Sequence, residues 1–304
     1  MTRQPSLVSI SIPTYNRCEL LERAVRSCLD QDHQRLEVVV VDNASTDGTE
    51  SLMARLVAAD PRVRYVRNPT NVGPTANFNL ARAEARGDHL MWLGDDDWLE
   101  PNYVSACLAV LDADRTLALA AGTVRYEHRG EPRGDGGRIE LRQHDPVDRV
   151  AGYFARVRDN GTFYGLSPRW AVRRTSGLLD RFGNDWFLLA ELAAIGGFGL
   201  APTTAVHREV GGATVSLRNV ARSGGHGRLA AEFPQLVLAA EAVRCCWSLP
   251  PFRELGPRRF PLGLRCGLVV LRRFLPSAAT AYGHLTAERI RTRFRTPVAS
   301  ARTG

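Results

Sequence analysis

The stretch Leu36-Glu37-Val38-Val39-Val40-Val41-Asp42 decides the fold. It is a nearly continuous run of apolar, mostly β-branched residues, and such a run is typical of a strand that is buried on both faces. A strand with one face in water would alternate apolar and polar residues instead. The run therefore predicts an interior strand of a parallel sheet with helices on both sides.

Similar apolar runs occur before and after this strand and alternate with segments of helical spacing. Further strands are expected over residues 7–12, 63–66, 89–93 and 117–126. The first helix should follow a cap at Asn16, with Glu19 three residues later. This alternation predicts an α/β fold built on a doubly wound, mostly parallel sheet flanked by helices.

The regular alternation stops after residue 126. Residues 127–138 are rich in Gly, Arg and Glu and predict a surface loop or hairpin. Helices are expected over residues 145–158, 186–194 and 229–247, and over parts of 263–274 and 278–295. We therefore predict an α/β domain over residues 1–220, with halves 1–125 and 126–220, and a helical basic extension over 221–304.

The net charge of +8 is concentrated near the end of the sequence. From Arg244 onward there are 12 arginines and only two acids, Glu254 and Glu288. A basic isoelectric point alone does not indicate nucleic-acid binding, so no nucleic-acid partner is expected. Residues 260–274 mix leucine with arginine, which fits either a basic amphipathic helix on an anionic membrane or a helix packed against the protein itself.

The cysteines and the hydropathy profile indicate the compartment. The six cysteines show no metal-binding spacing and lie in apolar segments, so we expect buried thiols in a reducing environment. No signal peptide is visible, and no apolar run reaches the roughly 18–20 residues that span a bilayer. We therefore expect a cytoplasmic protein, with peripheral contact to the inner face of the membrane left open.

Polar and acidic residues follow the predicted strands. Asp42 comes directly after one strand, and Asp95, Asp96 and Asp97 come after another. Carboxyl ends of parallel strands meet at one edge of the sheet, where ligands bind in open α/β folds. Three adjacent carboxylates repel one another unless a cation such as Mg²⁺ or Mn²⁺ compensates them. The alternative is a turn in which Asp96 or Asp97 caps the next helix.

Four segments together resemble the family 2 glycosyltransferases of GT-A fold. They are residues 8–17 (VSISIPTYNR), 40–49 (VVDNASTDGT), 67–73 (RNPTNVG) and 93–98 (LGDDDW). They occur in the family's order and spacing, and the resemblance continues less strongly to about residue 217. It implies an enzyme that moves a sugar from a nucleoside-diphosphate sugar to an acceptor hydroxyl.

The resemblance assigns roles to residues that would bind the donor. The segment that would line the nucleotide is Pro13, Thr14 and Tyr15. Asp42 matches the carboxylate that accepts a hydrogen bond from the base, commonly uracil. Asn71 and Gly73 match a stretch beside the diphosphate and the sugar.

The acidic run matches the family's DxD-type motif, which binds Mg²⁺ or Mn²⁺ and the nucleotide sugar. Many relatives have a further acid where Gly94 stands, so the division of labour among the three carboxylates stays open. By alignment Asp97 is favoured as the metal ligand, with Asp95 or Asp96 assisting. His207 matches a histidine that completes the metal or diphosphate site in some members.

Residues 183–192 (GNDWFLLAEL) resemble the family stretch that holds the catalytic base, and Asp185 is the matching residue. Asn184 stands where many relatives have glutamate. Asp185 also suits a capping position before the next helix, and the two roles are compatible. The resemblance thus implies a nucleotide-sugar-binding half over 1–125 and an acceptor-binding half over 126–220.

The implied reaction is a metal-assisted single addition with inversion. A UDP-sugar is favoured as donor, and the acceptor is a glycan, a lipid-linked sugar or a small natural product. A dehydrogenase would need a glycine fingerprint after the first strand, and none is present. Two alternatives remain, a catalytically inactive GT-A-like partner or scaffold and a GT-A-like nucleotidyltransferase.

Overall fold

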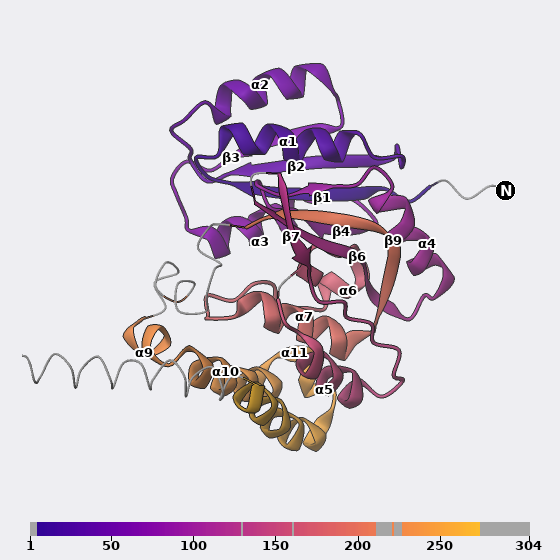
Figure 1. Ribbon diagram of the computed structural model, residues 1–304, viewed down its shortest axis with the longest axis vertical. Coiled ribbons are helices and arrows are strands. Elements are labelled where there is room, and N and C mark those ends of the chain that lie inside the picture. Colours follow the sequence, from indigo (N-terminus) through magenta and orange to yellow (C-terminus); the bar gives the residue numbers. More distant parts are fainter. Residues whose placement is uncertain (1–4, 129, 160, 211–220, 222–226, 274–304) are drawn as a thin grey trace, which may run out of the picture.

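The computed structural model describes residues 5–128, 130–159, 161–210, 221 and 227–273 (Figure 1). The first of two sheets has the strand order β3-β2-β1-β4-β8, in which β1 to β4 are parallel and β8 is antiparallel. Its strands are β1 (Val8–Thr14), β2 (Leu36–Asp42), β3 (Val63–Arg67), β4 (His89–Trp92) and β8 (Ser167–Pro168). The predicted mostly parallel α/β sheet is confirmed.

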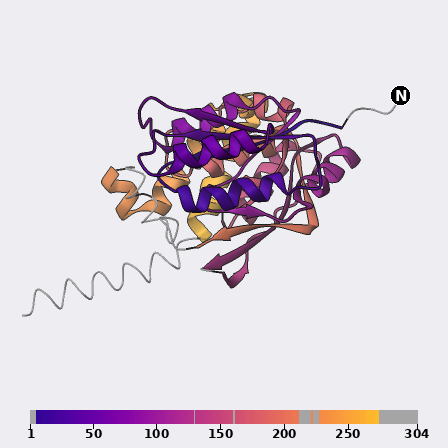
Figure 2. The ribbon, with the colours of Figure 1, turned by 90° about the horizontal axis from the view of Figure 1, so that it is seen from above.

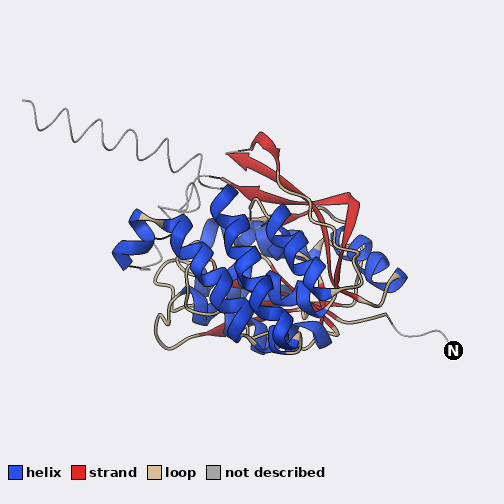
Figure 3. Cartoon of the chain, turned by 90° about the horizontal axis from the view of Figure 1, so that it is seen from below, coloured by secondary structure: helices blue, strands red, loops and turns tan. Residues whose placement is uncertain are grey.

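The second sheet has the order β5-β9-β6-β7. Its strands are β5 (Trp98–Leu99), β6 (Leu117–His128), β7 (Glu131–Asp135) and β9 (Gly197–Glu209). Leu166, just before β8, pairs with Ala120 of β6 and so joins the two sheets. The predicted loop or hairpin over 127–138 is the exposed β6–β7 hairpin, which projects from the body of the protein (Figures 2 and 3).

Helices cover both faces of the first sheet, with α1 and α2 on one face and α3 on the other (Figure 1). The helices of this part are α1 (Cys18–Leu29), α2 (Thr49–Ala59), α3 (Pro74–Glu84), α4 (Tyr103–Ala113), α5 (Pro146–Arg156), α6 (Arg169–Arg173) and α7 (Asn184–Ile195), with a 3-10 turn over Gly161–Tyr164. Val39 and Val41 pack with Ala81 of α3, whereas Val38 and Val40 belong to the main core on the other side. Both faces of β2 are therefore buried, as its apolar run predicts.

The C-terminal helices share the core of the α/β part. They are α9 (Gly227–Glu232), α10 (Pro234–Ser248), α11 (Pro250–Arg253), a 3-10 turn over Gly256–Arg258 and a helix over residues 259–273. The prediction of one continuous helix over 229–247 was wrong, because Pro234 starts a new helix after Phe233. Leu238, Cys246 and Leu262 belong to the main core. The predicted boundary at residue 220 and the helix expected over 278–295 lie outside the described residues.

Asn16 does not cap α1, because its side-chain oxygen accepts a hydrogen bond from the Thr46 amide at 2.7 Å and the capping residue is Arg17. All six cysteines are free thiols and all but Cys18 are buried, as expected. Within the described part of the chain, no helix has the length and apolarity needed to cross a membrane.

Candidate active site

The chain changes direction across the first sheet at β1, which has β2 on one side and β4 on the other. Such a switch point leaves a crevice at the carboxyl ends of the two strands, where open α/β sheets bind ligands. Thr14 ends β1 and lies opposite Asp42 at the end of β2. The Thr14 hydroxyl donates a hydrogen bond of 2.8 Å to Asp95, just beyond β4. The structure thus brings these three predicted site residues to one edge.

Asp95 and Asp96 share one cationic partner, Arg17. One guanidinium nitrogen lies 3.4 Å from Asp95 Oδ1 and 2.5 Å from Asp96 Oδ2. Asp95 is buried, whereas the Asp96 side chain is 29% exposed. Burial raises the pKa of Asp95 to about 6, and the Asp96 charge adds to this while Arg17 opposes it. The positive charge of Arg17 therefore compensates the two carboxylates only in part.

Asp97 is held by the protein on both of its carboxylate oxygens. It is 1% exposed. Its Oδ2 lies 3.4 Å from Arg208 Nε, its Oδ1 accepts the Glu209 amide at 3.2 Å, and the Tyr164 hydroxyl also bonds to the carboxylate. Burial raises the pKa of Asp97 to about 6, although Arg208 opposes this. Asp97 thus fixes the loop after β4 to the end of β9.

Arg208 is enclosed by aromatic rings. Its guanidinium carbon lies 4.9 Å from the centre of the Tyr164 ring and 5.7 Å from that of Tyr126. Arginine stacks well on aromatic faces because its planar guanidinium is weakly hydrated. The buried ion pair of Arg208 and Asp97 is therefore held in place by the aromatic side chains around it.

Gly94 occupies the position where many relatives carry an acid, and the structure leaves no room there for a side chain. A Cβ atom on Gly94 would lie 2.7 Å from Asp97 Oδ2 and 2.9 Å from the Tyr164 hydroxyl. The alternative that Asp96 or Asp97 caps the next helix is wrong, because α4 starts at Tyr103 and its capping position is Asn102.

Asp42 is fully buried and bonded on both oxygens. Its Oδ1 accepts the Ser45 amide at 2.9 Å and the Ser45 hydroxyl, while its Oδ2 accepts the Tyr65 hydroxyl at 2.7 Å. Arg67 Nε lies 3.5 Å from Oδ2. The three residues predicted to line the nucleotide differ in exposure. Pro13 and Thr14 are buried in β1, whereas Tyr15 is 45% exposed.

Asparagine side chains support the predicted diphosphate segment. Asn43 Nδ2 donates to Asn71 Oδ1 at 2.8 Å, and that same oxygen accepts the Gly73 amide at 2.9 Å. Gly73 has φ = +84°, a backbone conformation that favours glycine, and α3 follows directly. The chain between β3 and α3 is thus fixed beside the end of β2.

Asp185 lies in the first turn of α7, whose capping residue is Gly183 with a left-handed φ of +79°. The Asp185 carboxylate accepts the Trp186 amide at 2.9 Å, so it satisfies a helix-start donor without being the capping residue. Asn184 Nδ2 donates to the Thr75 hydroxyl in α3 at 3.3 Å. The start of α7 therefore lies beside the start of α3, next to the Gly73 loop.

His207 lies in β9 opposite Trp98, the residue that follows the acidic run. Its ring stacks on Trp98 at 5.0 Å, Nδ1 bonds to Glu127, and Nε2 lies 3.5 Å from Glu100 Oε1. The next residue, Arg208, is the one that reaches Asp97.

No three His, Cys, Asp or Glu side chains in the described ranges form a ready-made metal site. Mg²⁺ commonly uses one or two carboxylates and completes its shell with water and substrate phosphate. Buried carboxyl groups with raised pKa values, next to the partly exposed Asp96, fit such an oxygen-ligand site.

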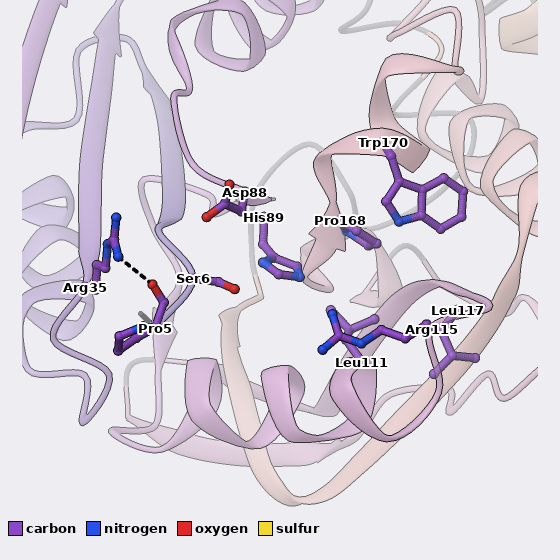
Figure 4. Close-up of a pocket in the computed structure, with 10 residues that line it drawn as sticks. All are labelled: Pro5, Ser6, Arg35, Asp88, His89, Leu111, Arg115, Leu117, Pro168 and Trp170. Carbon is purple, nitrogen blue, oxygen red and sulfur yellow. Dashed lines mark hydrogen bonds between the residues drawn. The ribbon is translucent and has the colours of Figure 1, made fainter. Parts of the chain in front are cut away.

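A pocket of about 440 Å³ lies at the opposite, amino-terminal edge of the sheets (Figure 4). Figure 4 shows Asp88 and His89, at the start of β4, between Arg35 and Trp170. None of the predicted site residues lines this pocket. It is therefore distinct from the site at the carboxyl edge.

Sequence reasoning missed three side chains that complete the site. Tyr164 and Tyr65 are separated in sequence from the acids that they contact, so no local pattern indicated them. Arg17 stands inside the first family-like segment, and its place in that segment was the one available signal. Arg208 directly follows His207 in the sequence, but arginine is too common in this chain for its presence there to be a specific signal.

The sequence of this chain is similar to those of known glycosyltransferases. Residues 9–179 match the model of "Glycosyl transferase family 2". The GalNAc(5)-diNAcBac-PP-undecaprenol β-1,3-glucosyltransferase of Campylobacter jejuni is 39% identical over 61% of this chain and 59% of its own length. The putative colanic acid glycosyl transferase WcaA of Escherichia coli is 32% identical over 57% of this chain and 60% of its own. A chondroitin synthase of Pasteurella multocida is 40% identical over 39% of this chain, a match that spans 12% of the synthase.

Solved structures share the fold. Staphylococcus aureus TarS (residues 1–349) in complex with UDP-GlcNAc superposes with a TM-score of 0.58 and 15% identity, covering 84% of this chain and 73% of TarS. The mannosyltransferase PcManGT of Pyrobaculum calidifontis, in complex with GDP-Man and Mn²⁺, gives a TM-score of 0.51 and 19% identity over 95% of this chain and 81% of its own. With the family model matching more than half of the sequence, the chain belongs to glycosyl transferase family 2.

Proposed function

We propose that the protein transfers a sugar from a nucleoside-diphosphate sugar, with a UDP-sugar favoured, to an acceptor hydroxyl in a single, inverting, metal-assisted addition. The observation that carries this proposal is the carboxylate edge of the first sheet, where Thr14 ties Asp95 to the end of β1. TarS binds UDP-GlcNAc and PcManGT binds GDP-Man on the same fold, which supports a nucleotide sugar as the donor.

The donor is assigned to the crevice at the switch point between β1 and β4. Tyr15 is exposed beside the buried Thr14 and offers its ring to the nucleotide. Asp42 is assigned to the base, for which one of its present donors, the Tyr65 hydroxyl or Arg67 at Oδ2, would have to give way. Asn71 and Gly73 take the diphosphate side, where the start of α3 adds a positive partial charge.

Mg²⁺ or Mn²⁺ is assigned chiefly to Asp96, with Asp95 assisting. Asp96 is the most accessible of the three carboxylates, whereas both oxygens of Asp97 are taken by protein donors. Arg17 now bridges Asp95 and Asp96, and it would have to move aside. When bound, the ion would neutralise negative charge on the diphosphate leaving group. This assignment moves the metal from Asp97 to Asp96 and leaves out His207.

Asp185 is assigned as the base. It takes the proton of the acceptor hydroxyl as the hydroxyl oxygen bonds to the anomeric carbon and the bond from that carbon to the diphosphate breaks. Holding both substrates at the starts of α3 and α7 supplies alignment for this in-line step.

A glycan, a lipid-linked sugar or a small natural product can serve as acceptor in this scheme. The Campylobacter relative carries an undecaprenol-linked saccharide in its name, which favours a lipid-linked acceptor. We place the protein in the cytoplasm, in peripheral contact with the inner face of the membrane through its basic C-terminal region. Its free, mostly buried thiols support a reducing compartment.

Thermal unfolding with a panel of nucleotide sugars and Mn²⁺ tests the proposal. At least one UDP-sugar should raise the melting temperature in the presence of Mn²⁺, because a ligand that binds only the folded state stabilises it. The same donor should be slowly hydrolysed by the protein in a metal-dependent reaction. Failure of every nucleotide sugar to bind would refute the proposed function.

Cation-dependent donor binding should weaken as the pH falls through 6. The pKa values of Asp95 and Asp97 are raised to about 6. Both groups are thus largely ionised at pH 8 and gain protons below pH 6, where a proton on Asp95 competes with the metal. Titration calorimetry with Mn²⁺ and the donor at pH 5.0 and 8.0 should show at least about a tenfold weaker affinity at the lower pH. An affinity that does not change would contradict a site built on Asp95.

A further inference from the structure

Two helices near the end of the described chain, α10 and the helix over residues 259–273, pack as an antiparallel hairpin, in which a Cβ atom on Gly263 or Gly267 would lie 3.1 Å from the carbonyl oxygen of Val243 or Ala239, respectively. A Cβ atom on Gly263 would lie 2.5 Å from Trp247 Nε1, and one on Gly267 would lie 2.6 Å from Val243 Cγ2. Two glycines one helical turn apart thus let the second helix lie directly on α10. We call this pair of helices the C-terminal hairpin.

One face of the C-terminal hairpin is buried in the protein. Leu238 and Ala242 of α10, and Leu262, Cys266 and Val270 of the second helix, repeat at helical spacing and all belong to the core. The core face is therefore already occupied, and it lies on the same side of both helices.

The opposite face exposes large apolar side chains. On the second helix they are Phe260, Leu264 and Leu268, spaced four residues apart, and Leu264 and Leu268 are 59% and 47% exposed. On α10 they are Leu236 and Trp247. Trp247 packs edge-on against Phe260 at 5.7 Å, so the two stripes form one surface. More than half of the exposed large apolar side chains in the described ranges lie between residues 229 and 268.

The surroundings of this apolar face are strongly basic. Residues 234–273 contain seven arginines and two glutamates. Glu241 is ion-paired with Arg181 and Arg244, and Glu254 with Arg174. Arg244 and Arg265 are exposed beside the apolar stripe. A second copy of this face would be repelled by like charges, whereas an anionic lipid surface would be attracted.

We propose that the outer face of the C-terminal hairpin lies on an anionic bilayer, with Leu264 and Leu268 inserted among the lipids and the arginines at the headgroups. An apolar stripe flanked by arginine is the pattern by which helices bind in the plane of a membrane. This proposal deepens the proposed function and rests on it in one respect. A protein that transfers sugar to a lipid-linked acceptor needs contact with the membrane that holds the acceptor.

The hairpin also places the acceptor side of the active site near the bilayer. A Cβ atom on Gly183, the residue that caps α7, would lie 2.5 Å from Leu238 Cδ1 of α10. Arg181 lies 3.5 Å from Glu241 of the same helix. Only the thickness of one helix, about 10 Å, therefore separates the start of α7 from the outer face. Asp185 would then meet an acceptor whose lipid stays in the membrane.

Vesicle flotation of the full chain tests this surface. The protein should float with phosphatidylcholine vesicles that contain phosphatidylglycerol and stay unbound with phosphatidylcholine alone. The double variant Leu264→Gln/Leu268→Gln should lower the floated fraction at least about fivefold, because it removes the inserted side chains. Arg244→Gln/Arg265→Gln should lower it by a similar factor. The control, Val57→Gln/Leu80→Gln, changes two other exposed apolar residues, 41% exposed each, on α2 and α3 and should float like the unchanged protein.

A second readout covers the case in which the leucine variant unfolds. Bromolipids in the phosphatidylglycerol vesicles should quench tryptophan fluorescence, and Trp247→Phe should remove most of that quenching. Absence of flotation, equal binding to uncharged vesicles, or flotation of the leucine variant at the full level with Trp247 unquenched would each overturn the proposal. Binding of residues 274–304 or a protein partner to this face would give the last of these results.

The assay separates this proposal from the proposed function. Flotation requires no donor, so Asp185→Asn should float like the unchanged protein. A protein that floats but transfers no sugar would refute the proposed function and leave the membrane surface standing. A protein that transfers sugar to a water-soluble acceptor but never floats would do the reverse.

Discussion

Replacing Asp185 by asparagine should abolish sugar transfer while leaving the affinity for the nucleotide sugar nearly unchanged. Asparagine keeps the oxygen that accepts the Trp186 amide, so the first turn of α7 should survive. It cannot take a proton from the acceptor hydroxyl, and loss of a general base typically costs 10²–10⁴-fold, or about 10³-fold here. Transfer rates at saturating donor, together with donor affinity by calorimetry, give the two readouts.

Asp148→Asn is a matched control for this variant. Asp148 is also an acid in the first turn of a helix, α5, and its side chain is exposed. It should transfer sugar at the unchanged rate. If Asp185→Asn loses donor affinity as strongly as it loses transfer, Asp185 belongs to the donor site and is not the base.

Asp96→Asn and Asp97→Asn should fail in opposite ways. Asp97→Asn leaves the charge of Arg208 buried without its carboxylate partner, and breaking such a pair costs about 3 kcal/mol of the free energy of unfolding. Asp96→Asn touches a partly exposed side chain, so stability should change little while metal-dependent donor binding is lost. Urea unfolding at pH 8 and calorimetry with Mn²⁺ measure the two effects.

The double variant Asp97→Asn/Arg208→Met is the control for the buried pair. Removing both charges should restore much of the stability that Asp97→Asn loses, because no unpaired charge stays in the core. The opposite pattern, in which Asp97→Asn is as stable as the unchanged protein but no longer binds Mn²⁺, would return the metal to Asp97, as the sequence alignment favoured.

The sequence predicts the first half of the fold well because its signals are local. The valines of β2 indicate burial on both faces without reference to any other segment, and the structure confirms it. The cap at Asn16 was wrong because the side chain of Asn16 bonds instead to Thr46, which lies beyond the next strand. The helix over 229–247 was wrong because its periodicity continues across Pro234, where the backbone must start anew.

The sequence predicts part of the site, because the local signals that place the strands also place the residues at their ends. Thr14, Asp42 and Asp95 meet at one edge because parallel strands must end there, and the strand order alone dictates it. The partners of the acids follow another rule, since Arg208 reaches Asp97 from β9 of the second sheet and Tyr164 reaches it from the 3-10 turn over Gly161–Tyr164. The partners of a buried carboxylate are set by tertiary packing. They therefore depend on how the two sheets pack together, which the local sequence does not show.

The tight fit around Gly94 has a consequence for how this chain can change. An acid at position 94 would come too close to the Tyr164 hydroxyl and to Asp97 Oδ2, so both side chains would have to shift to make room for it. A smaller residue at 164 would remove one of these two contacts and leave Asp97 alone to shift. Positions 94 and 164 should therefore covary among relatives, with glycine accompanying tyrosine and a larger residue at 94 accompanying a smaller one at 164.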